Sequence, residues 1–118
     1  MGNGSGSFIL KSGPTVVDVN AVHKIPSERC NFPGTKRAVL LAEVKKGVLK
    51  EGDEIVLKNP AGEILNDVVV RLEVKCEPYD QVAAGVNVGV LLMNHSPEEL
   101  TRFGLPLHRV GSSNDRHP

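Results

Sequence analysis

The chain has 118 residues, the usual size of one domain, with a formal net charge of zero and 40% hydrophobic residues drawn mostly from valine and leucine. Three Phe, one Tyr and no Trp, together with 12 Gly and 8 Pro, argue against a helical bundle and are typical of a turn-rich β protein. No apolar run approaches the roughly 20 residues that span a bilayer, and no secretory signal pattern is present, so we expect a cytoplasmic protein without membrane association.

The two ends of the chain are predicted to be tails. Residues 1–12 begin with a stretch rich in Gly, Ser and Asn (Met1–Ser7), and we expect a flexible leader there. Residues 111–118 are polar and lack apolar periodicity, which predicts a polar tail. The segment between them, residues 13–110, is expected to form one domain.

Period-two alternation of apolar residues predicts strands in four segments: Thr15–Val22, Ala38–Val44, Val68–Cys76 and Val86–Leu92. Side chains two residues apart share one face of a strand, so each segment has one face expected to be apolar. Those faces comprise Val17, Val19 and Ala21; Ala38, Leu40, Ala42 and Val44; Val68, Val70, Leu72, Val74 and Cys76; and Val86, Val88, Val90 and Leu92.

The connections between these segments have turn-forming residues. Asn59–Gly62, with Pro60 at its second position, predicts a hairpin after the apolar run Ile55–Leu57. Gly47 and Gly52 flank Val48–Glu51, which is expected to form a tight connection between two strands. Ser96-Pro97-Glu98-Glu99 combines an N-cap serine, proline at the first helical position and a glutamate three residues on, which predicts one helical turn. The longest irregular connection, His23–Lys36, is either a functional loop or a spacer.

Six strand candidates joined by short turns favour a small closed barrel, because closure removes exposed sheet edges. An open β-sandwich is the main alternative.

Four segments resemble parts of a known domain. They are Gly47–Glu54 with the pattern G-x-L-K-x-G-D-E; Leu72–Val74 followed by Asp80 and Ala83; Ala84–Leu92 with the pattern A-G-x-N-V-G-V-L-L; and Glu98–Arg102 followed by Gly104 and Leu107. In this order and spacing they resemble the second domain of translation elongation and initiation factors, elongation factor Tu in particular. The resemblance implies an all-β fold, a closed six-stranded antiparallel Greek-key β-barrel, without the GTPase domain of those factors.

The chain departs from the family pattern in three places. Thr35–Ala38 is bulkier and more basic than the family's glycine-rich start of the second strand, and Arg102–Gly104 is one residue longer than its counterpart. Pro106 falls where the last strand is expected to pair. Since proline has no N–H, that strand is predicted to lie at an edge or to contain a bulge.

Residue patterns for catalysis are absent from the sequence. No phosphate-binding G-x-x-x-x-G-K-[ST] loop and no N-K-x-D motif occurs, so GTP hydrolysis is not expected. The four histidines do not have metal-ligand spacing, and Cys30 and Cys76 are expected to be free thiols. We therefore predict a protein that is not an enzyme, with no cofactor and no metal site. The histidines are His23, His95, His108 and His117.

Binding is the favoured class of function. Residues 1–50 carry eight Lys/Arg against three Asp/Glu, and residues 51–118 carry six against eleven. The RNA-binding candidates, expected to line one side of the barrel, are Lys36, Arg37, Lys45, Lys46 and Lys50, with Asn87 added by the resemblance, which implies transfer RNA or ribosomal RNA as the partner. The alternative for the basic residues is a solvated hairpin interleaved with Glu43, Glu51 and Asp53, and the alternative for Asn87 is that it only satisfies backbone groups. The few aromatic residues offer little base stacking, so recognition of RNA is expected to be led by the phosphate backbone.

Three hypotheses follow. The first is a module that contacts RNA or the ribosome. The alternative is a protein-interaction or structural module that does not bind RNA, with a dimer through an exposed strand as one variant. An enzyme related to flavin-binding reductases comes last. The sequence leaves open the identity of the partner, cooperation with a separate GTPase and the oligomeric state.

Overall fold

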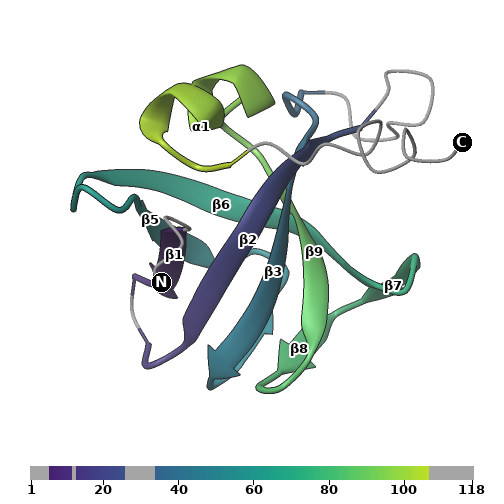
Figure 1. Cartoon of the computed structure of the whole chain (residues 1–118). Helices are drawn as coiled ribbons and strands as arrows, with labels where there is room; N and C mark the ends of the chain where they lie inside the picture. The colour runs from purple at the N-terminus through teal and green to yellow at the C-terminus, as the bar shows by residue number, and fades with distance from the viewer. Residues whose placement is uncertain (1–5, 12, 26–33, 107–118) are drawn as a thin grey trace, which may run out of the picture.

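The computed structural model describes residues 6–11, 13–25 and 34–106 (Figure 1). The elements, in chain order, are β1 (Gly6–Leu10), β2 (Val16–Lys24), β3 (Ala38–Lys46), β4 (Val48–Lys50), β5 (Glu54–Lys58), β6 (Ile64–Val74), β7 (Glu77–Tyr79), β8 (Gln81–Ala83), β9 (Asn87–Leu92) and α1 (Pro97–Phe103). Within these residues, no helix is long and apolar enough to cross a membrane.

Six strands form a closed antiparallel barrel, which confirms the predicted fold class. The strand order is β5-β1-β2-β3-β9-β6, and a further pairing of β5 with β6 closes the ring. Since β1, β2 and β3 are consecutive and β5 returns beside β1, the connection is a Greek key. The short strand β7 extends β6 as a hairpin, and β4 pairs with β8 in a separate two-stranded sheet.

Side chains fill the barrel and close both of its ends. Phe8, from β1, is fully buried in the core with the inward residues of the other barrel strands. The helix α1 lies across one end and buries Leu100 against the core, while Leu49 of β4 and Val82 of β8 pack from the β4–β8 sheet at the other (Figure 1). Each such side chain contributes roughly 1.5–3 kcal/mol through removal of apolar surface from water.

The alternation predicted for β3 is confirmed, because its four inward residues are all buried. The same holds in β9 for Val88, Val90 and Leu92. These two strands pair with each other over five residues, and each fills the barrel with alternate side chains.

The predicted leader is wrong in its second half. Gly6–Leu10 forms strand β1, which pairs with β2 on one side and with β5 on the other. The segment has few residues and no clear alternation, so only its pairing with two distant strands defines it as a strand. Residues 1–5 and residue 12 of the predicted leader, and the predicted tail 111–118, lie outside the described residues.

Bulges change which residues of β2 and β6 point inward. In β2, Asn20 is an extra residue opposite β3, so Val22 is buried and the expected Ala21 is only half-buried. In β6, Val70 is the extra residue opposite β9, and the buried positions become Val69 and Leu72. A bulge inserts one residue into one strand and so reverses the alternation beyond it.

Cys76 is not on the apolar face predicted for it. Strand β6 ends at Val74, and Lys75 and Cys76 form the turn to β7 with φ angles of 54° and 69°. Cys76 is an exposed free thiol there.

The predicted hairpin turn and helix start are confirmed, and the helix continues for seven residues, beyond the single turn predicted. In the β5–β6 hairpin, the Gly62 N–H donates to the Asn59 carbonyl at 2.9 Å and Gly62 has a φ of 91°. In α1, the Ser96 hydroxyl accepts the Glu99 N–H at 3.0 Å and the Glu99 carboxylate accepts the Ser96 N–H at 2.7 Å. Gly104 ends the helix in the left-handed conformation.

Pro106 is the last residue that the structure describes, and the rest of the predicted final strand lies outside the described residues. Pro106 follows α1 in an irregular segment, and its carbonyl accepts the Val22 N–H at 2.7 Å. The bond lies beside the bulge in β2, where the ladder to β3 is interrupted.

Candidate nucleic-acid interface

The structure separates the predicted RNA-binding residues into two groups at opposite ends of β3. Lys36 and Arg37 precede the first residue of the strand, and Lys45 and Lys46 are its last two residues. An extended strand rises about 3.3 Å per residue, so about 30 Å separate the two groups. The basic candidates therefore do not form one cluster, because the two groups lie at opposite ends of the same strand.

The group near α1 is held by protein contacts. The Lys36 ammonium lies 3.6 Å from the Glu99 carboxylate, and the Arg37 guanidinium donates to the Ile25 carbonyl at 3.4 Å. A neighbouring bridge joins Lys24 to Glu98 at 2.9 Å. These contacts tie the β2–β3 connection to the first turn of α1, and they oppose each cation with a carboxylate or a carbonyl.

Both carboxylates of this turn have lowered pKa values. The hydrogen bond from the Lys24 ammonium is the main cause at Glu98, and the backbone N–H of Ser96 is the main cause at Glu99. Both side chains stay anionic near neutral pH, so they offset the Lys24 and Lys36 cations beside them.

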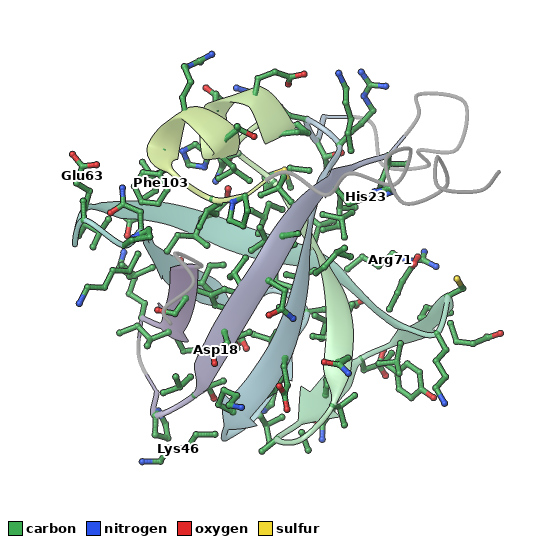
Figure 2. All side chains as sticks on the ribbon, viewed as in Figure 1. Asp18, His23, Lys46, Glu63, Arg71 and Phe103 are labelled. Atoms are coloured by element: carbon green, nitrogen blue, oxygen red, sulfur yellow. The ribbon has the colours of Figure 1, made fainter. Side chains whose placement is uncertain are left out.

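The second group forms what we call the lysine end: Lys45, Lys46, Lys50 and Asn87. All four residues are exposed at the end of the barrel opposite α1, where Figure 2 labels Lys46. The β3–β4 and β4–β5 turns position the lysines.

Gly47 shapes the first of these turns. Its φ is 81°, and a β-carbon there would lie only 2.6 Å from the Thr15 hydroxyl oxygen and 2.9 Å from the Thr15 Cα. The same hydroxyl bonds both backbone groups of Val48, donating to its carbonyl at 2.7 Å and accepting its N–H at 3.2 Å. The glycine and the threonine thus fix the direction in which the chain leaves Lys46.

Carboxylates limit the positive charge of the lysine end. Lys45 lies 3.5 Å from Glu43, and the Asp53 carboxylate accepts the backbone N–H of Lys50 at 2.7 Å. Within the described residues, the Lys46 and Lys50 ammonium groups form no ion pair. These two cations are available to an external anion, and Lys45 becomes available if it leaves Glu43.

Asn87 joins the lysine end through strand pairing. It is the first residue of β9 and lies directly opposite Glu43 of β3, and Lys45 is two residues further along the same face. Its side chain makes no hydrogen bond with the part of the chain that the structure describes. The alternative in which Asn87 only satisfies backbone groups therefore has no contact in its favour.

The structure also contains a buried carboxylate that sequence reasoning missed. Asp67 is 2% exposed, and one of its oxygens accepts three backbone N–H groups, from Val68, Met93 and Asn94, at 2.7–3.0 Å. Its other oxygen lies 2.7 Å from Nδ1 of His95. The contacts tie β6 to the connection between β9 and α1, which is a structural role. An aspartate within the apolar stretch Leu65–Val70 was the signal available in the sequence.

The remaining predicted positions add no chemistry at this surface. Among the described residues, no group of three or more His, Cys, Asp and Glu side chains has the geometry to hold a metal ion. Cys30, His108 and His117 lie outside the described residues.

No protein-family model matches the chain.

Proposed function

We propose that this protein is a non-catalytic binding module that contacts RNA, transfer RNA or ribosomal RNA, through the lysine end. The observation that carries the proposal is the grouping of three exposed lysines with Asn87 on adjoining turns and strands. Phosphate groups recur along an RNA chain, so several cations on one exposed surface can contact successive phosphates. The resemblance to the second domain of translation factors supports the same partner class.

The aromatic residues favour recognition of the phosphate backbone over stacking on bases. Phe8 is fully buried, and Phe103 packs against the core. Tyr79 is exposed, but it lies on β7, in the hairpin that extends from the barrel. An interface led by phosphates has weak sequence preference and strong salt dependence. The proposal also places the protein in the cytoplasm, where such RNA is abundant.

The proposal predicts how steeply the RNA-binding constant falls as the salt concentration rises. Each phosphate neutralised on single-stranded RNA contributes about −0.7 to the slope of log K against log salt. Three lysines at one end therefore predict a slope of about −2, and five basic residues on one surface would have given about −3.5.

The test is fluorescence anisotropy of labelled transfer RNA and ribosomal RNA fragments, from low to physiological salt. The variant Lys45→Glu/Lys46→Glu/Lys50→Glu should lose binding. A matched control, Lys24→Glu/Lys36→Glu/Arg102→Glu, has the same change in net charge at the α1 end and should retain most of it. Equal loss in both variants would mean that total charge, and not the lysine end, attracts RNA.

Flat titrations of the unmodified protein at low salt would refute RNA binding, because phosphate attraction is strongest there. The protein-interaction alternative would then be preferred. Its test is recovery of a partner in a pull-down that survives nuclease treatment.

A further inference from the structure

The outer surface of three neighbouring barrel strands has a symmetric pattern that RNA binding does not use. β1 lies between β2 and β5 (Figure 1). Ile9 of β1 pairs with Val16 on one side and with Val56 on the other. Two residues earlier, Ser7 pairs with Asp18 and with Lys58. We call these six residues, in their two rows, the two-row face.

The apolar row points away from the core. The residues between the two rows, Phe8, Val17 and Leu57, are fully buried, so their neighbours in each strand face outward. Ile9 is 47% exposed, and Val16 and Val56 are half-buried. Three β-branched side chains thus form a continuous apolar line across the three strands.

The polar row places opposite charges on either side of β1. Adjacent strands lie about 4.8 Å apart, so the backbones at Asp18 and Lys58 are about 10 Å apart across Ser7. Both side chains are exposed, and neither forms an ion pair within the described residues. Figure 2 labels Asp18 on β2.

We propose that the two-row face binds a second copy of this chain. The two copies are related by a two-fold axis that lies between the two faces and runs parallel to β1. Rotation about this axis places β2 of one copy over β5 of the other. Ile9 then meets its own counterpart, Val16 meets the partner's Val56, and Asp18 meets the partner's Lys58. The two ion pairs and the apolar row are satisfied together, and this self-complementarity is what an isologous interface requires.

The interface is small. The barrel curves away beyond these three strands, so the face falls below the roughly 800 Å² per partner of a standard stable interface. The dimer is therefore weak, with a dissociation constant on the order of 0.1–1 mM. Lys46 of the lysine end pairs with Val16 and so borders the two-row face, whereas Lys50 and Asn87 lie on β4 and β9, outside its three strands.

Sedimentation equilibrium of the full chain over a hundredfold range of concentration tests the proposal. The average mass should rise with concentration, and less so at high salt, because exposed ion pairs are screened. Ile9→Glu should abolish the rise. The control Tyr79→Glu changes a residue of similar exposure, 48%, on another surface and should leave it intact.

Charge exchange tests the symmetry itself. Asp18→Lys and Lys58→Asp each place like charges opposite one another twice, and each should weaken dimerisation about tenfold. The double variant Asp18→Lys/Lys58→Asp restores both pairs with reversed polarity and should recover dimerisation. Circular dichroism confirms that each variant is folded.

Two results would overturn the proposal: a monomeric mass at the highest concentration of the unmodified protein, or a folded double variant that dimerises no better than the single ones. RNA titrations of the Ile9→Glu variant separate the two inferences, because loss of the dimer should leave binding at the lysine end unchanged.

Discussion

Replacement of Asp67 by alanine removes the acceptor that holds three backbone N–H groups and His95. The carboxylate is 2% exposed and joins β6 to the segment between β9 and α1. Without it, the Val68 and Asn94 N–H groups lose this acceptor at the point where the barrel meets the helix, while the Met93 N–H keeps its bond to the Val68 carbonyl at 3.1 Å. The variant should be strongly destabilised.

The size of the destabilisation depends on the N–H donors that lose their acceptor. An unsatisfied buried donor costs about 1–3 kcal/mol. Met93 and Asn94 are exposed residues, so water can reach part of this site once the carboxylate is gone. We expect a loss of about 3 kcal/mol in the free energy of unfolding, a large share of the roughly 5–15 kcal/mol typical of a domain. The melting temperature should fall by about 10–15 °C.

Urea denaturation followed by far-ultraviolet circular dichroism measures this loss. Asp67→Asn is the matched control: its amide oxygen can still accept the three N–H groups, so it should cost only about 1 kcal/mol. An Asp67→Ala variant within about 0.5 kcal/mol of the unmodified protein would refute the reasoning. So would an asparagine variant as unstable as the alanine variant, since charge and not acceptor geometry would then be decisive.

Two further predictions concern the first strand and the helix. Gly6→Ala places a β-carbon 2.7 Å from the Lys58 carbonyl oxygen and against Leu105, so thermal unfolding should show a loss of about 1–3 kcal/mol. Gly13→Ala, whose β-carbon makes only ordinary contacts, should change stability by less than about 0.5 kcal/mol, and equal effects would contradict a packed β1. Glu99 has a native pKa below its usual 4.5, so its contribution to stability is present above pH 4.5 and is lost as the pH falls through the native pKa. The melting-temperature difference between the unmodified protein and Glu99→Gln should therefore shrink on acidification, and a constant difference would argue against this origin.

Local features of the sequence were sufficient to predict much of the barrel. Alternation in β3 and β9 identified the residues that fill the barrel. No bulge interrupts β3 between Ala38 and Val44 or β9 between Val88 and Leu92 where these two strands pair. The Asn59–Gly62 turn and the Ser96–Glu99 capping box were also predictable. These motifs satisfy their own backbone groups within a few residues, so their conformation depends little on the rest of the chain.

Pairing between distant segments decided the rest. β1 is a strand because β2 and β5 provide partners on both of its edges and the core accepts Phe8. The bulges at Asn20 and Val70 result from fitting neighbouring strands to one another around a closed ring, and no local signal marked them.

The candidate site divides in the same way. The sequence by itself determined which residues carry positive charge and which segments connect them. Only the tertiary structure decided that β3 separates Lys36 and Arg37 from Lys45 and Lys46, while strand pairing brings Asn87 beside Lys45. The reason is physical: an extended strand carries its two ends apart by about 3.3 Å per residue, and antiparallel pairing brings together residues that are far apart in the chain.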